Sequence, residues 1–148
     1  MAKPEFLVVE DNEVDVRYLR HVLSKAGITA ISHARDGEQA IAQLRSLTEG
    51  LSTDRVATQI VMLLDLNLPV MNGFDVLKFV QTNPLLSRMK IFVVTSNDDE
   101  LSRELAAKWG ATGYIVKPLS LAQIANILET IGQPARRSAP ATSVVSES

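Results

Sequence analysis

The sequence of 148 residues contains no cysteine, and this absence excludes disulfide bonds, thiolate zinc sites and cysteine nucleophiles together. Its two histidines, His21 and His33, are too isolated to form a metal site, so we expect structural or surface roles for them. The net charge is only −2, which gives no indication of a nucleic acid or an anionic lipid as a partner. No apolar run reaches membrane-spanning length, and the N-terminus lacks the long apolar stretch of a signal peptide. We therefore expect a cytoplasmic protein that binds neither nucleic acid nor a membrane.

What the chain does contain is the composition of an ordinary globular protein, with 46% apolar and 22% charged residues. Its length suits one domain with a hydrophobic core of its own. We expect this domain to span residues 1–132. The remaining residues, 133–148, are rich in serine, alanine and proline, which predicts a disordered C-terminal tail.

Short apolar runs alternate along the chain with stretches of helical period. Five runs are predicted to be strands, namely 5–10, 30–34, 60–65, 90–95 and 113–117. Three of them are apolar almost throughout, as is typical of parallel strands that helices cover on both faces. The amphipathic segments between and after them predict five helices, with capping signals at Gly27, Asp36 and Ser120. This alternation predicts an α/β domain with a parallel, doubly wound sheet.

Polar side chains stand at the carboxyl ends of four predicted strands. The first strand ends in Glu10 and Asp11, the third in Asp65, the fourth in Thr95 and Ser96, and the fifth in Lys117, which Pro118 follows. Ligands bind outside these carboxyl ends in open parallel sheets, so we expect a site there. Asp65 supports this expectation, because it ends the apolar run "IVMLLD" with no basic residue nearby. An unpaired carboxylate beside a hydrophobic core costs free energy, so a functional role would explain its presence.

The residue types at these strand ends suit phosphoryl transfer. Clustered acids repel one another and relieve the repulsion by binding a cation, and oxygen ligands alone favour a hard ion such as Mg²⁺. With a cation, Lys117 and the Thr95 hydroxyl directed at the same space, Asp65 is equipped to act as a nucleophile and become an aspartyl phosphate.

Each of these signals also has a structural explanation when it is taken alone. An aspartate after a strand commonly caps a helix or closes a turn, and Glu10 with Asp11 would cap the helix that follows. Thr95 alone would be a turn hydroxyl, and Lys117 alone would be a solvated surface residue. Four such signals at the appropriate strand ends favour one shared site.

Four motifs occur in order: "VVEDN" (8–12), "LLDLNLPVMNG" (63–73), "VVTSN" (93–97) and "GATGYIVKP" (110–118). With these motifs, the chain resembles the receiver domain of two-component response regulators across about residues 4–132. The resemblance implies a flavodoxin-like (βα)5 fold, a doubly wound arrangement with a five-stranded parallel sheet in the order 2-1-3-4-5.

The resemblance also implies a role for each site residue. Asp65 is similar to the phosphoacceptor, and Glu10 and Asp11 to the acidic pair that holds Mg²⁺ together with Asp65 and the backbone carbonyl of Asn67. Lys117 resembles the lysine that contacts the phosphoryl group, and Pro118 its usual cis-proline partner. The phosphoryl-binding and switch positions are Thr95, Ser96 and Tyr114, with Thr95 moving toward the phosphate and Tyr114 turning inward.

As a response regulator, the chain would accept its phosphoryl group from a sensor histidine kinase that docks near Val14 and Tyr18 of the first helix. Only the tail follows the domain in this sequence, and the connection 47–58 is long. Single-domain regulators with these features resemble the group that serves bacterial phytochromes, which implies a bacterial phytochrome as the kinase.

A homodimer is a further expectation for this chain. Leu121, Ile124, Leu128 and Ile131 form the predicted core stripe of the last helix, and Ala125 and Ile127 widen its apolar face. A face wider than the core requires favours a partner surface. In the resembling family, the fourth helix, fifth strand and fifth helix often form a dimer face.

Under the signalling hypothesis, the protein is not an enzyme: it catalyses only its own phosphorylation and dephosphorylation. Other functions compete with this hypothesis. Aspartate-nucleophile phosphatases also place an aspartate after a parallel strand with Mg²⁺, but they carry a D-x-D motif whose second aspartate protonates the leaving group. In this sequence Asn67 stands at that second position and cannot act as a general acid. A receiver that acts only as a phosphorylation-independent scaffold is the third alternative. A nucleotide-binding protein is disfavoured, because "EDN" stands after the first strand in place of a glycine-rich turn.

Overall fold

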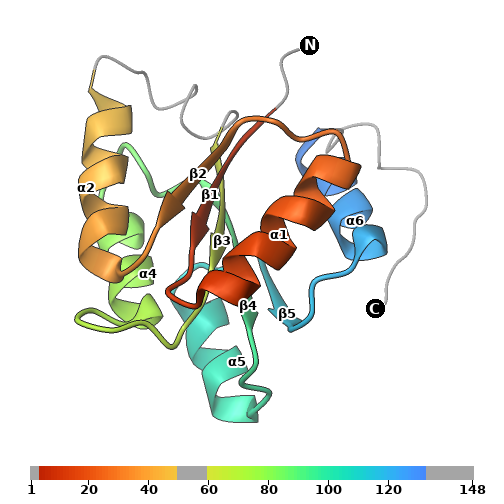
Figure 1. The fold of residues 1–148 in the computed structure, drawn as a ribbon. Coiled ribbons are helices and arrows are strands. Elements are labelled where there is room, and N and C mark those ends of the chain that lie inside the picture. The colour runs from red at the N-terminus through yellow and green to blue at the C-terminus, as the bar shows by residue number, and fades with distance from the viewer. Residues whose placement is uncertain (1–3, 50–59, 133–148) are drawn as a thin grey trace, which may run out of the picture.

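The computed structural model describes residues 4–49 and 60–132, in which strands and helices alternate (Figure 1). The strands are β1 (Glu5–Val9), β2 (Ile31–Ala34), β3 (Ile60–Leu64), β4 (Lys90–Thr95) and β5 (Gly113–Val116). The helices are α1 (Glu13–Lys25), α2 (Gly37–Thr48), α4 (Gly73–Gln81), α5 (Glu100–Lys108) and α6 (Leu121–Gly132). The five predicted strands and five predicted helices are therefore confirmed, close to their expected bounds.

The five strands form one parallel sheet in the order β2-β1-β3-β4-β5, as predicted. Val9 of β1 pairs with Leu64 of β3, and the amide of Asp65 donates to the carbonyl oxygen of Val9 at 3.0 Å. This register brings Glu10 and Asp65 side by side, one residue beyond the two central strands. The strand order reverses direction at β1, so these two acids lie at the switch point of the sheet.

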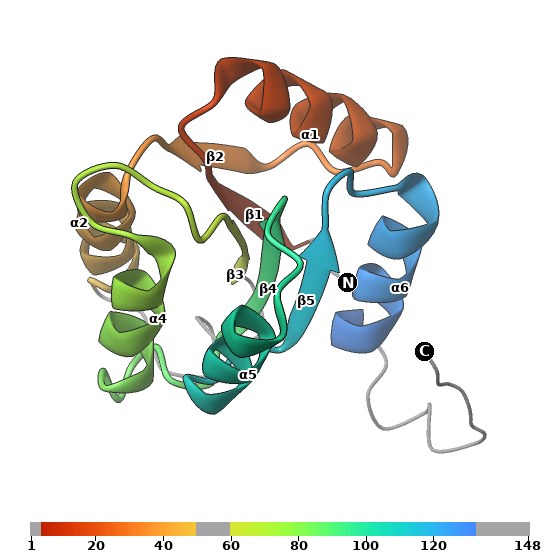
Figure 2. The same cartoon turned by 90° about the horizontal axis from the view of Figure 1, so that it is seen from below.

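Helices cover both faces of the sheet, with α1 and α6 on one face and α2, α4 and α5 on the other (Figure 2). Alternate side chains of the central strands enter the two cores. Leu7 and Leu64 pack under α2, α4 and α5, whereas Val8 and Leu63 pack under α1 and α6. The continuous apolar character of β1 and β3 follows from this double burial. Full burial of one such side chain is worth about 2 kcal/mol.

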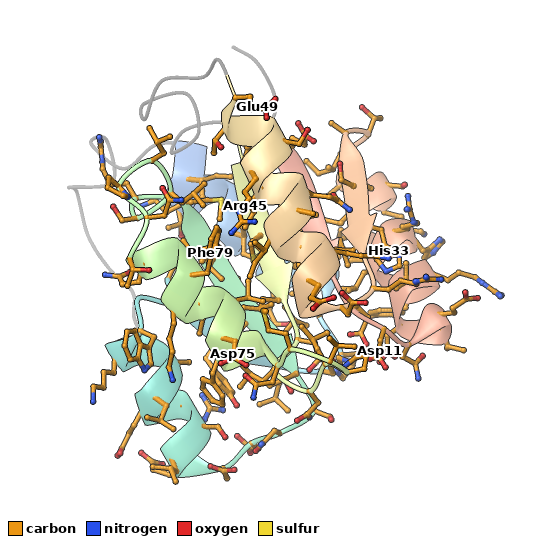
Figure 3. The ribbon with its side chains drawn as sticks, turned by 90° about the vertical axis from the view of Figure 1, so that its left-hand side faces the viewer. Asp11, His33, Arg45, Glu49, Asp75 and Phe79 are labelled. Atoms are coloured by element: carbon orange, nitrogen blue, oxygen red, sulfur yellow. The ribbon has the colours of Figure 1, made fainter. Side chains whose placement is uncertain are left out.

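On the face that α2, α4 and α5 cover, α2 and α4 lie side by side (Figure 3). The guanidinium carbon of Arg45 in α2 lies 5.3 Å from the ring centre of Phe79 in α4. This cation–π contact joins the two helices at their outer side.

The helix ends are closed by local signals that the sequence displays. Gly27 and Gly110, which follow α1 and α5, have φ angles of 87° and 92°, a region that glycine enters without steric cost. Ser120 and Gln123 form a reciprocal capping box before α6. The N-cap of α1 is Asn12, whose side chain accepts the amide of Asp15. Glu10 and Asp11 are thus not the cap of this helix.

The phase of the last helix differs from the prediction. Ile127 is 3% exposed and lies in the core with Ile124, while Leu128 and Ile131 pack against that core. Leu121, a residue of the predicted core stripe, is 49% exposed. The prediction was wrong on both residues, because the buried stripe is the i, i+3, i+4, i+7 series that starts at Ile124.

Helix α2 continues to Thr48, so the predicted connection 47–58 begins later than expected, and its remainder lies outside the described residues. The predicted tail, 133–148, also lies outside them. Among the helices that the structure describes, none combines the length and apolar character needed to cross a membrane.

Candidate functional site

One ammonium group joins three carboxylates at the carboxyl ends of the strands. Lys117 Nζ lies 2.8 Å from Glu10 Oε1, 2.9 Å from Asp65 Oδ2 and 2.6 Å from Asp15 Oδ2. Lys117 follows β5, Glu10 follows β1, Asp65 follows β3, and Asp15 belongs to the first turn of α1. The parallel sheet thus brings together residues that are far apart in the chain. Glu10 and Lys117, for example, are separated by 107 positions.

Asp65 is 6% exposed, and both of its carboxylate oxygens have partners. Oδ2 accepts from Lys117, and Oδ1 accepts the backbone amide of Asn67 at 3.0 Å. The basic partner that the local sequence lacks is supplied by a residue 52 positions away. Asp65 is therefore held in place beside the core with one oxygen toward the ammonium.

Glu10 is still more buried, at 2% exposed, and its Oε2 accepts the backbone amide of Asn12 at 3.1 Å. Burial raises the pKa of Glu10 to about 7, and the neighbouring charge of Asp65 acts in the same direction, whereas the hydrogen bonds from Lys117 and Asn12 oppose the rise. Burial acts to lower the pKa of Lys117, but its hydrogen bonds to Asp15, Glu10 and Asp65 outweigh this, so that the pKa is raised. The ammonium is therefore charged at neutral pH.

The donor atoms at this edge fit a hard divalent cation. Glu10, Asp65 and Asp11 offer carboxylate oxygens, and Asp11 is exposed (Figure 3). Within residues 4–49 and 60–132, however, no three acidic or imidazole side chains are arranged together as metal ligands. The ammonium of Lys117 instead lies between Glu10 and Asp65. A cation that binds here has to draw these two carboxylates away from the ammonium.

The residues for which the resemblance implies a switch role lie at the end of β4, directly after it and on β5. Thr95 is fully buried, and its hydroxyl oxygen accepts the amide of Asn97 at 3.3 Å, whereas Ser96 is exposed. The Tyr114 hydroxyl donates to the carbonyl oxygen of Asn97 at 2.7 Å, and the Arg103 guanidinium lies 4.7 Å from its ring centre. Thr95 and Tyr114 thus share one hydrogen-bond partner residue, Asn97.

The peptide bond between Lys117 and Pro118 is cis, as the resemblance implied. Beside it lies a pocket of 230 Å³ at the junction of α1 with the segment after β5. The residues that line it are Val14, Asp15, Tyr18, Leu19, Val94, Lys117, Pro118 and Leu119. The Tyr18 hydroxyl donates to the carbonyl oxygen of Leu119 at 2.8 Å and joins the two sides. The exposed residues expected to receive a kinase, Val14 and Tyr18, therefore adjoin the site.

Sequence reasoning missed Asp15, which makes the shortest of the three contacts to Lys117. The sequence indicated only that Asp15 lies near the site, in the first turn of a helix that begins just after the acidic end of β1, and not which face of that helix it occupies. It also missed the hydrogen bond of 2.7 Å between His33 Nε2 and the carbonyl oxygen of Glu10 (Figure 3). This bond gives His33 a structural role beside the site.

The chain matches the family model of the response regulator receiver domain over residues 6–129. The chain belongs to this family. Chemotaxis protein CheY1 of Helicobacter pylori is 28% identical to this receiver domain over 127 residues, which cover 86% of the chain and 95% of CheY1. The uncharacterized transcriptional regulatory protein YcbL of Bacillus subtilis is 30% identical over 118 residues, or 80% of the chain. The chain spans about half of YcbL, since the match covers 46% of that protein.

Solved structures of response regulators have the same fold as this receiver domain. The phosphorylated cyanobacterial phytochrome response regulator RcpA is 28% identical, with a TM-score of 0.71 over 90% of this chain and 97% of RcpA. The Mn²⁺-bound form of response regulator Rcp1 is 26% identical, with a TM-score of 0.66 over 86% of this chain and 93% of Rcp1. Receiver domains are signalling domains, which favours the signalling hypothesis over the phosphatase alternative.

Proposed function

We propose that this receiver domain accepts a phosphoryl group on Asp65 from a sensor histidine kinase and thereby changes its binding surface. The observation that carries the proposal is the contact of Lys117 Nζ with both Asp65 and Glu10 at the switch point of the sheet. In the transfer, an Asp65 oxygen forms a bond to phosphorus, and the donor group leaves with the electron pair of the broken bond.

The residues of this chain have separate parts in that step. Lys117 places positive charge next to the attacking carboxylate and neutralises the phosphoryl oxygens once they arrive. The amide of Asn67, which donates to Asp65 Oδ1, orients the carboxylate. Glu10, Asp11, Asp65 and the carbonyl of Asn67 would hold Mg²⁺, which supplies further charge neutralisation when bound. The Mn²⁺-bound neighbour Rcp1 supports a divalent cation in this fold.

The downstream change involves Thr95 and Tyr114. A phosphoryl group on Asp65 offers new acceptor oxygens at the end of β3, and the Thr95 hydroxyl lies at the end of the adjacent strand β4. If Thr95 turns to donate to them, its bond from the Asn97 amide is altered, and Asn97 also holds the Tyr114 hydroxyl. The surface around Tyr114 then differs between the phosphorylated and the unphosphorylated protein.

The first experiment incubates the protein with Mg²⁺ and acetyl phosphate and records its intact mass. We expect one added phosphoryl group in the wild type, none in Asp65→Asn, and none when EDTA is present. Asp75→Asn removes an exposed aspartate of α4 and is the matched control that should still be phosphorylated. Absence of phosphorylation with Mg²⁺ and with Mn²⁺ would leave the scaffold as the better hypothesis.

The kinase that we propose is of the phytochrome type, on the strength of the likeness to RcpA, which is a phytochrome response regulator. The same mass measurement extends to this proposal. An autophosphorylated phytochrome kinase should phosphorylate Asp65 faster than a chemotaxis kinase does. The reverse order would favour the likeness to CheY1 instead.

We further propose a homodimer through the face of α5, β5 and α6, which are the fourth helix, fifth strand and fifth helix of the sequence prediction. Leu101 of α5 is 65% exposed, and Leu121 and Ala125 of α6 are exposed as well. Light scattering should give a dimer mass, and Leu101→Glu with Leu121→Glu should reduce it to a monomer mass. A monomer in the wild type, both with and without acetyl phosphate, would refute this.

A further inference from the structure

Lys117 and a divalent cation require the same two carboxylates. Glu10 Oε1 and Asp65 Oδ2 both contact Lys117 Nζ, and both side chains are the proposed cation ligands. Their second oxygens already accept the backbone amides of Asn12 and Asn67. A cation therefore competes with the ammonium for these oxygens, and the ammonium needs another partner when the cation binds.

Asp15 has the position and the contact that this partner requires. Its Oδ2 lies 2.6 Å from Lys117 Nζ, and its side chain is 38% exposed, whereas those of Glu10 and Asp65 are almost fully buried. Asp15 belongs to α1, outside the strand ends that carry the proposed cation ligands. Its backbone is fixed independently, because its amide donates to the N-cap side chain of Asn12.

We propose that Asp15 is a positioning residue that holds Lys117 when a divalent cation takes Glu10 and Asp65. The ammonium then has a carboxylate partner of its own and does not compete with the cation for its ligands. Without Asp15, Lys117 depends on Glu10 and Asp65 alone, and the cation has to displace it without an alternative partner. The proposal rests on the proposed function, since it assumes that a divalent cation binds these carboxylates.

The test measures Mg²⁺ binding to the unphosphorylated protein by isothermal titration calorimetry. We expect Asp15→Asn to raise the Mg²⁺ dissociation constant about threefold to tenfold, the effect of a charge-assisted hydrogen bond reduced by partial exposure. Asp15→Glu, which keeps a carboxylate, should recover most of the affinity. Circular dichroism in EDTA checks that each variant is folded.

The control for charge alone is Glu13→Gln. Glu13 is exposed in the same helical turn, is not among the carboxylates that contact Lys117, and loses the same unit of charge on substitution. We expect its dissociation constant for Mg²⁺ to change less than twofold, as for other exposed charges. An equal loss in Glu13→Gln and Asp15→Asn would overturn the proposal, because the effect would then be one of charge and not of contact.

Phosphorylation kinetics give a second readout. In Asp15→Asn, the Mg²⁺ concentration at half-maximal rate with acetyl phosphate should rise in parallel with the dissociation constant, while the rate at saturating Mg²⁺ should change less than about twofold. Unchanged or tighter Mg²⁺ binding in Asp15→Asn would overturn the inference and leave the proposed function standing. Failure of the wild type to bind Mg²⁺ would overturn both, and calorimetry on the wild type distinguishes the two cases.

Discussion

Replacing Lys117 by alanine is expected to lower the free energy of unfolding of the metal-free protein by about 3 kcal/mol at pH 8. The substitution removes the ammonium that contacts Glu10, Asp15 and Asp65, and two of these carboxylates are almost fully buried. Buried carboxylates that face one another without a cation repel and cannot regain their hydration. Urea denaturation in EDTA measures the loss.

The same variant should show a defined pH dependence. Folding raises the pKa of Glu10 from 4.5 to about 7, mainly by burial. Such a carboxyl contributes stability that is fully present below the unfolded pKa and is lost as the pH rises through the folded pKa. Since the hydrogen bond from Lys117 opposes the rise, its removal raises the pKa further and enlarges this loss. The destabilisation by Lys117→Ala should therefore be smaller at pH 5 than at pH 8.

Mg²⁺ separates the structural from the chemical role of Lys117. The cation should bind Lys117→Ala at least as tightly as the wild type, because no ammonium competes for Glu10 and Asp65, and it should restore part of the lost stability. Phosphorylation of Asp65 should remain slow at saturating Mg²⁺, since the charge that Lys117 brings to the phosphoryl oxygens is still absent.

Lys108→Ala is the control for this series, because Lys108 is an exposed lysine in the last turn of α5. Its removal should cost less than about 1 kcal/mol. Equal losses in the two variants, or a larger loss for Lys117→Ala at pH 5 than at pH 8, would contradict the account of the site as a set of buried carboxylates held by one ammonium.

The position of the site was predictable because its main residues end apolar strands. Glu10 and Asp65 stand directly after the buried strands β1 and β3, Lys117 follows the half-buried edge strand β5, and a parallel sheet brings such ends to one edge. The contacts of Lys117 with Glu10 and with Asp65 therefore follow from strand order and register. Hydrophobic periodicity and the motifs already indicate that order and register.

Asp15 was not predictable in the same way, because its contact with Lys117 depends on how α1 is rotated on the sheet. That rotation is fixed by packing of Leu19, Val22 and Leu23 against the strands, and a helix side chain moves to another face with a small change in phase. The error on α6 has the same origin. Leu121 and Ile127 are equally apolar in the sequence, and only packing against β4 and β5 decides which of them enters the core.

The glycine that opens α4 is the second residue whose replacement should have a large effect. Gly73 lies against the residues that carry the site, since its amide donates to the carbonyl oxygen of Leu66 at 3.0 Å. A Cβ added at Gly73 would lie 2.5 Å from the carbonyl oxygen of Asp65 and 2.7 Å from Leu66 Cα. These are backbone atoms of a buried segment, so they cannot move aside as a flexible side chain would.

Gly73→Ala should therefore destabilise the protein by about 2 to 3 kcal/mol, as overpacking of a close-packed interior does. The gain in helix propensity from alanine is smaller and partly offsets the loss. Gly132→Ala is the matched control, because a Cβ at Gly132 meets nothing within 4 Å, and its stability should change by less than about 0.5 kcal/mol. Urea denaturation compares the two variants.

Phosphorylation should respond to Gly73→Ala as well, even though Gly73 carries no side chain. The new methyl group pushes on the carbonyl of Asp65, and a displacement of that backbone shifts the carboxylate relative to Lys117 Nζ, which lies 2.9 Å from Asp65 Oδ2. Small misplacements of a reacting group cost large factors in rate, so the rate with acetyl phosphate at saturating Mg²⁺ should fall at least about tenfold. A variant that is destabilised but phosphorylated at the wild-type rate would show that the backbone of α4 yields instead, and that the position of Asp65 is set by β3 alone.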